Sequence, residues 1–269
     1  MNLSFNIFSA IYSRWSLIVL LSRREIDLRY KSTGLGIVWS AISLLVQLLI
    51  YTFIFGFIFN ARWPGEGHTE IADYSLILFT GLVCYSVFNE TISRAGSVVT
   101  AAPYLVKKVI FPVEVLPVAI LNAALFHAFV GLILILCVLL FKLQLPPLTI
   151  ILLPVVLLPL VLFSLGFAWI FAALGVFIKD TQYVSTLFGQ VVFYASPILY
   201  PLDIIPEKFQ WIILLNPLSL CVDMFRKVIL FGQTPELSTW LTLTFICYLY
   251  AMLAYNFFLR MKREFPNVI

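Results

Sequence analysis

Residues 115–141 read VLPVAILNAALFHAFVGLILILCVLLF, an apolar run without a single Asp, Glu, Lys or Arg. A helix needs about 20 apolar residues to cross the roughly 30 Å hydrocarbon core of a bilayer. The run therefore predicts a membrane-spanning helix. Five further charge-poor stretches predict the same, at residues 37–59, 74–92, 148–178, 184–200 and 238–259. Pro154 and Pro159 predict a bend in the fourth of the six spans.

The composition agrees with this prediction. Of the 269 residues, 62% are hydrophobic and 11% are charged, and the mean hydropathy is +1.04. A soluble domain carries about 25% charged residues, because it needs a polar surface. A soluble enzyme, a disordered chain and a nucleic-acid-binding module are excluded. We expect an all-α polytopic membrane protein.

Two segments are apolar without predicting ordinary spans. Residues 2–21 place aromatic and aliphatic side chains at helical spacing opposite Asn6, Ser9 and Ser13. This pattern favours an amphipathic helix in the membrane interface over a signal peptide, because no Lys or Arg precedes Arg14 and no small-residue cleavage site follows. Residues 204–231 are interrupted by charges and by Asn216-Pro217, a helix-stopping turn signal. They predict a re-entrant outer hairpin of two short helices.

The basic residues set the predicted topology. Most of the 17 Lys and Arg residues fall on one side of six alternating spans: Arg14, Arg23, Arg24, Arg29, Lys31, Arg94, Lys107, Lys108, Lys179, Arg260, Lys262 and Arg263. The positive-inside rule puts these residues, and both termini, in the cytoplasm of a multi-pass inner-membrane protein. We divide the chain into residues 1–36, the interface helix and basic cluster, and residues 37–269, the transmembrane domain.

The predicted spans hold few ionisable groups. His127 is the one at a span centre, whereas Glu90 and Glu114 lie near cytoplasmic ends and Asp73 near an outer end. An ion-coupled carrier needs carboxylates or broken helices at mid-membrane. Paired catalytic acids, an HExxH motif and a phosphate-binding GxxxxGK[ST] loop are also missing from the sequence. We therefore expect no catalytic residue, metal site or cofactor in this chain, a structural hydrogen bond for His127, and a partner that supplies energy.

Aromatic and basic residues are the candidates for binding. Tyr51, Phe55 and Phe59 form one stripe of the first span, and Phe193, Tyr194 and Tyr200 end the fifth. These rings suit lipid-facing packing, and they also suit the passage of sugar rings. The cluster of Arg23, Arg24, Arg29 and Lys31 precedes the first span. It suits topology anchoring, anionic lipid or the phosphate of a lipid-borne substrate.

Three blocks of sequence then identify a family resemblance. Residues 24–39 read REIDLRYKSTGLGIVW, residues 103–107 and 111–117 read PYLVK and FPVEVLP, and Lys179-Asp180 is followed by Ser196-Pro197-Ile198, Tyr200 and Asn216-Pro217. In this order the blocks resemble permease subunits of bacterial ABC transporters that export polysaccharides or polyol phosphates. Thr33, Ser43-Leu44 and Lys179 depart from the family pattern, and none of them removes a catalytic group.

The resemblance implies a homodimer bound to two copies of a separate ABC ATPase, which would carry the ATP and Mg²⁺. The cargo would be an undecaprenyl-diphosphate-linked polysaccharide of the O-antigen class. Teichoic acid, capsule or small-molecule export remains the alternative, and a membrane transferase is a more distant one. Residues 97–108 would be the ATPase-coupling helix, with Ser97, Pro103, Tyr104, Lys107 and Lys108. Asn216 and Pro217 would belong to the outer gate, Arg24, Arg29 and Lys31 would capture the lipid diphosphate, and the six aromatic residues would line the channel.

Overall fold

The computed structural model describes residues 12–30, 34, 36, 38–59, 71–106, 111–142 and 145–268, the side chains of residues 30, 71–73 and 106 excepted. Every regular element in these ranges is helical, which confirms the predicted all-α class. The elements are α2 (Trp15–Tyr30), α3 (Val38–Tyr51), the π-helix η1 (Thr52–Ile58), α4 (Ile71–Val98), α5 (Pro103–Val106), α6 (Val115–Phe141), η2 (Leu148–Leu152), α7 (Leu153–Phe177), α8 (Thr181–Tyr194), η3 (Leu202–Ile204), α9 (Glu207–Leu214), α10 (Pro217–Ile229), α11 (Leu237–Met261), η4 (Lys262–Glu264) and α12 (Phe265–Val268).

Five helical segments in the described ranges are long and apolar enough to cross a membrane: Val38–Ile58, Tyr74–Val98, Val115–Phe141, Leu148–Phe177 and Leu237–Val268. They correspond to five of the six predicted spans. The other stretch, residues 184–200, falls on α8, whose 14 residues rise only about 21 Å at 1.5 Å per residue. The second predicted span also differs, because its helix continues six residues past 92 to Val98.

The helix bundle is centred on α4 and α7. The segment Tyr74–Val98 is the most enclosed of the five, with 78% of its most apolar window buried. Besides contacting each other, α4 contacts α6, and α7 packs along α11. Gly96 and Gly175 let α4 and α7 cross closely, since a Cβ added at Gly175 would overlap the carbonyl oxygen of Gly96. Small residues at such crossings are typical of membrane helices, because they let backbones approach.

The fourth span is helical throughout from Leu148 to Phe177, and the bend at Pro154 and Pro159 stays a prediction. The segment starts as the 3-10 helix η2, and Pro154 lies in the first turn of α7. A proline is well accommodated there, because its missing N–H would have no intrahelical partner. Pro159 lies inside the helix and is buried.

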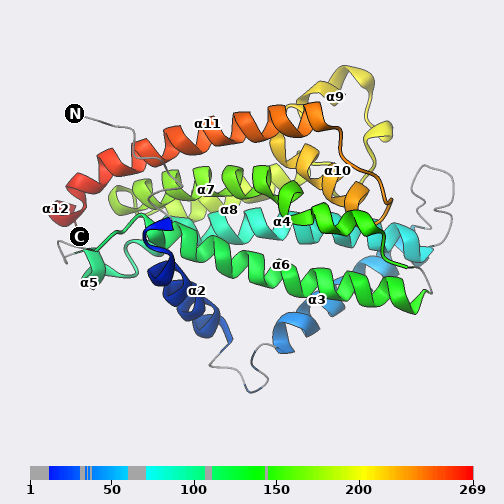
Figure 1. Cartoon of the computed structure of the whole chain (residues 1–269), viewed down its shortest axis with the longest axis horizontal. Helices are drawn as coiled ribbons and strands as arrows, with labels where there is room; N and C mark the ends of the chain where they lie inside the picture. Colours follow the sequence, from blue (N-terminus) through cyan, green and yellow to red (C-terminus); the bar gives the residue numbers. More distant parts are fainter. Residues whose placement is uncertain are drawn as a thin grey trace.

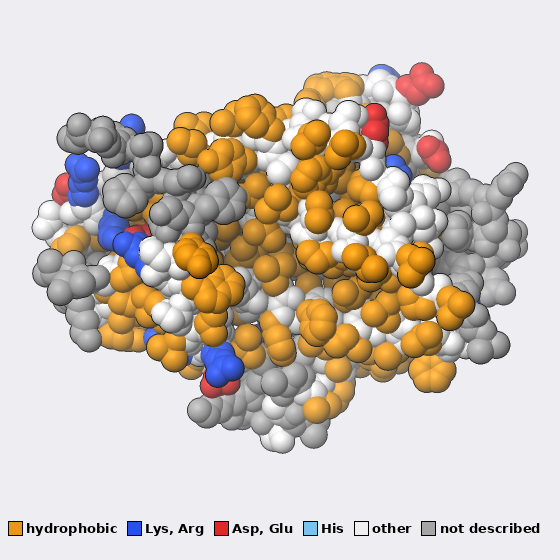
Figure 2. Space-filling model, viewed as in Figure 1, with side chains coloured by type: hydrophobic (Ala, Val, Ile, Leu, Met, Phe, Trp, Pro, Cys, Tyr) orange, Lys and Arg blue, Asp and Glu red, His pale blue; other side chains and the backbone are white. Residues whose placement is uncertain are grey.

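The two ends of the bundle differ in character. Helices α5 and α12 lie at one end and α9 at the other, with α11 running between them (Figure 1). On the face that Figure 2 shows, apolar side chains cover the middle of the molecule, and Lys and Arg gather toward the α5 and α12 end. An apolar band between polar ends is what a bilayer requires of an embedded protein.

The described N-terminal helix continues nine residues past the end of the predicted interface helix, to Tyr30. Helix α2 begins at Trp15, so it overlaps only the end of the predicted interface helix, and residues 1–11 lie outside the described part of the chain. Arg23, Arg24 and Arg29 of the basic cluster are helical too, since α2 continues to Tyr30. Ile18 and Leu21 are buried where α2 packs against α6.

The segment before α11 contains the break expected at Asn216-Pro217, with α9 on one side and α10 on the other. The Asn216 side chain accepts a hydrogen bond from the Leu218 amide at 3.1 Å, so Asn216 is the N-cap of α10. Pro217 follows at the first helical position, which it favours.

Candidate functional site

A cavity of about 440 Å³ opens between α3, α4, α6 and α8. Its wall combines apolar side chains with a carboxylate, an imidazole, three amides and five Phe and Tyr rings. The lining residues are Leu44, Gln47, Tyr51, Phe79, Leu82, Val83, Tyr85, Ser86, Asn89, Glu90, His127, Gln190, Phe193 and Tyr194. This size and this mixture of surfaces are typical of sites for small organic groups.

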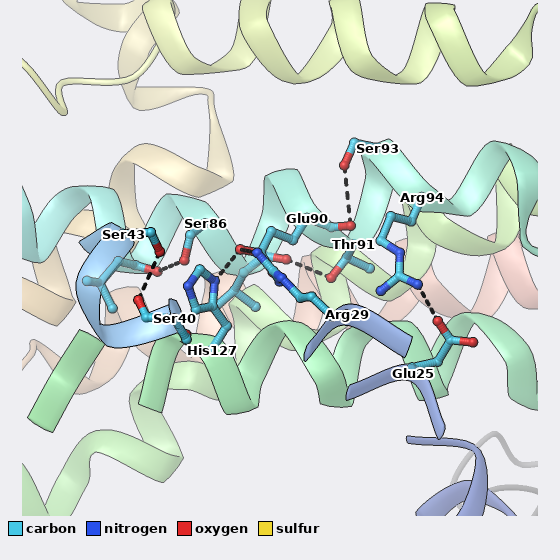
Figure 3. Close-up of polar contacts among 12 residues, drawn as sticks. Glu25, Arg29, Ser40, Ser43, Ser86, Glu90, Thr91, Ser93, Arg94 and His127 are labelled. Carbon is cyan, nitrogen blue, oxygen red and sulfur yellow. Dashed lines mark hydrogen bonds and ion pairs between the residues drawn. The ribbon is translucent and has the colours of Figure 1, made fainter. Parts of the chain in front are cut away.

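A polar cluster forms one part of the cavity wall (Figure 3). Arg29, at the end of α2, donates to both carboxylate oxygens of Glu90, at 2.5 Å from Nη1 to Oε2 and 3.2 Å from Nη2 to Oε1. The His127 Nδ1 atom contacts Glu90 Oε1 from α6. Glu90 and His127 are 18% and 8% exposed, so a single carboxylate joins α2, α4 and α6 away from bulk solvent.

The partner of His127 is Glu90, a residue that we expected near the cytoplasmic end of its span. Glu90 reaches His127, which lies midway along α6. The sequence pattern missed the pair because α4 extends further toward the α5 end than predicted, so Glu90 lies deeper inside its helix. The expectation of a hydrogen-bonded His127 is confirmed. Gln47, Asn89 and Gln190 carried no sequence signal, since an amide in an apolar run predicts no partner by itself.

Three of the six candidate aromatic residues line the cavity: Tyr51, Phe193 and Tyr194. Phe55 continues from Tyr51 with ring centroids 6.0 Å apart, and Phe59 follows Phe55 at 5.8 Å, away from the cavity. The Tyr200 hydroxyl donates to the Tyr194 carbonyl oxygen at 2.6 Å. The predicted aromatic stripe is therefore a continuous row, of which only the Tyr51 end borders the cavity.

The candidate basic residues separate into two places. Arg29 binds Glu90, which lines the cavity, whereas the Arg24 guanidinium lies 5.9 Å from the ring centroid of Tyr104. Arg24 and Ser97 also line a second cavity of about 210 Å³, between α2, α4 and α6. Lys31, Lys107 and Lys108 lie outside the described residues.

The predicted coupling segment is not one helix. Ser97 is in the last turn of α4, and α5 begins afresh at Pro103. Proline lacks the N–H that would continue the helix, and it restricts the residue before it, which explains the interruption. Arg24, which we expected to bind the lipid diphosphate, and Tyr104, which we expected in the ATPase-coupling segment, are nevertheless in contact.

Three ion pairs hold α2 against the bundle: Arg14 with Glu114, Glu25 with Arg94, and Arg29 with Glu90. Glu114, which precedes α6, also accepts from Lys262 Nζ at 2.5 Å. Burial raises the pKa of the Glu114 carboxyl, but the hydrogen bond from Lys262 and the charges of Lys262 and Arg14 outweigh it, so its pKa lies below 4.5. One carboxylate thus connects α2 with the end of α11.

The candidate gate residues Asn216 and Pro217 are tied to the bundle through α10. Arg226 of α10 is 4% exposed and donates to the carbonyl oxygens of Ile77, Pro197 and Ile198, at 3.1, 2.9 and 2.8 Å. Gly81 of α4 leaves room for the Arg226 guanidinium, since a Cβ there would lie 2.6 Å from Arg226 Nη2. This buried cation joins α10 to α4 and to the segment that follows α8.

Comparison with known proteins gives one family and several relatives. A family described as ABC-2 type transporter matches residues 16–230. The chain is 27% identical over 219 residues to an O-antigen export system permease protein RfbA of Klebsiella pneumoniae, covering 81% of this chain and 82% of that protein. Its similarity to the RfbA protein of Myxococcus xanthus is 24% over 261 residues, 96% of this chain and 97% of the relative. The polysialic acid transport protein KpsM of Escherichia coli is 24% identical over 214 residues, 79% and 81% of the two chains.

Proposed function

Because the chain belongs to the ABC-2 type transporter family, we propose that it is the membrane permease subunit of an ATP-driven polysaccharide exporter of the O-antigen class. Its cargo is a polysaccharide linked to undecaprenyl diphosphate, moved out of the cytoplasm across the inner membrane. The relatives named for O-antigen export support a polysaccharide of this class as the cargo. The relative named for polysialic acid transport makes capsular polysaccharide the second candidate.

The cavity of about 440 Å³ is the observation that carries the proposal. Sugars offer both apolar ring faces and hydroxyl groups, so a surface that handles them needs aromatic rings next to hydrogen-bonding groups. Tyr51, Phe193 and Tyr194 supply the rings, and Gln47, Asn89 and Gln190 supply amides. A purely lipid-facing wall would need no such amides, because unpaired polar groups are costly in hydrocarbon.

A second copy of the chain completes the channel in this proposal. The segment Val38–Ile58 has only 11% of its most apolar window buried within one chain. On α8, large apolar side chains beside the cavity are exposed, among them Val184, Leu187 and Val191. Apposition of these faces in a homodimer would turn two half-open cavities into one enclosed passage.

The membrane arrangement follows from the charge distribution. The five long segments and α8 make six spans, with α8 extended by the residues up to 200. The α5 and α12 end, where basic side chains gather, faces the cytoplasm together with both termini, as the positive-inside rule predicts. Residues 1–36 then lie at the cytoplasmic interface, and α9 and α10 form the re-entrant hairpin that gates the outer end through Asn216 and Pro217.

ATP and Mg²⁺ are bound by two copies of a separate ATPase. It docks on the segment of residues 97–108, with Ser97, Pro103, Tyr104, Lys107 and Lys108. Arg24, Arg29 and Lys31 capture the lipid diphosphate. The contact between Arg24 and Tyr104 supports a link between capture and docking, because an anion that draws Arg24 away would disturb the docking segment.

The proposal is tested with two variants that each remove one aromatic ring. Tyr51→Ala removes a ring from the cavity, and Phe245→Ala removes one that is 62% exposed on α11, outside the proposed dimer interface. Because aromatic contacts are worth about 0.5–1.5 kcal/mol each, we expect Tyr51→Ala to lower the export rate of intact glycan roughly 2- to 10-fold. Phe245→Ala should leave the rate unchanged.

Surface glycan is measured in cells in which the variant replaces the chromosomal copy, with the amount of protein in the membrane as the reference. Equal export by both variants would contradict the cavity assignment. Normal surface glycan in cells that lack the gene would reject polysaccharide export altogether.

A further inference from the structure

The second cavity, of about 210 Å³, brings two guanidinium groups together. It lies between α2, α4 and α6, and both Arg24 and Arg94 line it. Glu25 is the only carboxylate among the residues that line it, so the wall carries a net positive charge. A cleft lined mainly by one sign of charge concentrates ions of the opposite sign. The cavity therefore favours an anion.

Both guanidinium groups keep N–H donors that no described residue uses. Arg94 donates from Nη2 to Glu25, as Figure 3 shows, and the Arg24 guanidinium faces the ring of Tyr104. A guanidinium has five N–H donors in a planar fork, which matches the oxygens of a phosphate group. The Ser97 hydroxyl also lines the cavity, and it makes only a long hydrogen bond of 3.4 Å to the Arg94 carbonyl oxygen. Two guanidinium groups and one hydroxyl can therefore donate to an anion.

The size and the rim of the cavity select the class of anion. A volume of about 210 Å³ is below the usual range of about 300–1,000 Å³ for sites that enclose a whole ligand, so the cavity suits a group of a few atoms. Leu28 lines the cavity and is 61% exposed, so it offers an apolar contact beside the basic groups. A hydrocarbon chain gains free energy from such a contact, because it leaves water. A phosphate group that carries a lipid chain fits both features.

We propose that the second cavity binds the phosphate group of a membrane lipid through Arg24, Arg94 and the Ser97 hydroxyl. The inference rests on the proposed function, in which Arg24 captures a lipid diphosphate, and it adds Arg94 and Ser97 as ligands of the phosphate. Glu25 is a competing anion, because its carboxylate binds Arg94 and repels a phosphate. Ser97 belongs to the segment on which the ATPase docks in that proposal, so a bound phosphate contacts this segment directly.

A phosphate site and a purely structural ion pair predict different effects of two substitutions. Arg94→Gln and Glu25→Gln break the same ion pair, so a structural role would weaken lipid binding in both variants. In the proposed site Arg94→Gln removes a ligand, and we expect binding about 10-fold weaker, as the loss of a charge-assisted hydrogen bond predicts. Glu25→Gln removes the competing anion, and we expect binding about 3- to 10-fold tighter.

The probe is tritiated farnesyl diphosphate, a short polyprenyl diphosphate, and its binding to the full chain in a neutral detergent is measured by scintillation proximity. No ATPase is added, because its own phosphate site would bind the probe. Arg23→Gln is the matched control, since Arg23 is exposed on α2, carries the same charge as Arg24 and lines neither cavity. We expect Arg23→Gln to change binding by less than about 2-fold.

Competing lipids distinguish the sources of the phosphate. Displacement of the probe by phosphatidylglycerol at similar concentrations would assign the site to phospholipid headgroups, and displacement by unlabelled farnesyl diphosphate alone would assign it to the lipid diphosphate. Either result supports the phosphate site. No binding of the probe, equal displacement by farnesol, which lacks a phosphate, or the same decrease for Arg94→Gln and Glu25→Gln would overturn it. These results would leave the proposed function intact, because that function is rejected by normal surface glycan in cells that lack the gene.

Discussion

Glu114→Gln is the substitution whose effect the structure specifies most closely. The Glu114 side chain is 6% exposed and pairs with Arg14 of the N-terminal segment and with Lys262 at the end of α11. Glutamine keeps the size of the side chain and removes the negative charge. Its backbone carbonyl oxygen, which accepts from Trp169 Nε1 at 3.1 Å, is not affected. The substitution therefore isolates the two charge-assisted bonds.

The magnitude follows from burial. A hydrogen bond to a charged group is worth about 1.5–3 kcal/mol. The Arg14 and Lys262 side chains are 36% and 31% exposed, so each regains water when the carboxylate is lost, and the lower value applies. The sum is about 3 kcal/mol, which corresponds to a decrease in Tm of roughly 6–12 °C for a chain of this size.

The assay is the fraction of monodisperse protein that remains after heating in detergent, measured by size-exclusion chromatography. Glu264→Gln removes an exposed carboxylate that accepts only from Asn267 among the described residues, and it should shift Tm by less than about 1 °C.

Because the folded pKa of Glu114 is lowered, the contribution of its carboxylate to stability is complete above pH 4.5 and is lost as the pH falls through the folded pKa. The two melting curves should converge below pH 4.5. An unchanged Tm at neutral pH would refute the reasoning.

Two further predictions concern close packing and the outer hairpin. Gly175→Ala places a Cβ on the Gly96 carbonyl oxygen, so α4 and α7 must separate, which should lower the free energy of unfolding by roughly 3 kcal/mol. Gly34→Ala, with no described atom within 4 Å of the added Cβ, is the control in the same heating assay. Arg226→Lys should lower stability by roughly 2–4 kcal/mol, because one ammonium group cannot reach three carbonyl oxygens as the guanidinium does. Lys227→Met on the same helix, which breaks a half-exposed pair with Asp223, should cost less than about 1 kcal/mol. Equal shifts for Arg226→Lys and Lys227→Met would show that the buried contacts contribute nothing.

Local features of the sequence were sufficient for much of the fold. The apolar runs predicted six spans, five of which are long helices in the structure, and Asn216-Pro217 predicted a helix break. Length, hydropathy and turn chemistry are properties of a few adjacent residues, so they can be read locally. The ends of α4 and α2 were less predictable. Residues between 92 and 98, and the basic residues 23–29, are compatible with helix or with loop until packing against α6 and α7 decides.

The site depended on contacts between distant residues. Glu90 and His127 each read as an isolated polar residue in an apolar span, and Arg29 read as one of a basic cluster. Their meeting is fixed by how α2, α4 and α6 lie beside one another, at sequence separations of 37 and 61 residues. Sequence periodicity cannot predict such a pairing, because the pairing depends on the relative rotation and axial shift of three helices.

Composition, apolar runs and turn signals thus determined by themselves that the chain is a helical membrane protein, because the cost of placing polar backbone and charge in lipid acts on each segment separately. The tertiary structure alone decided which polar side chains share a cavity, that Glu114 joins α2 to α11, and that Arg226 ties α10 to α4. Those outcomes come from close packing between helices, where one small residue such as Gly81 or Gly175 decides whether two helices can meet.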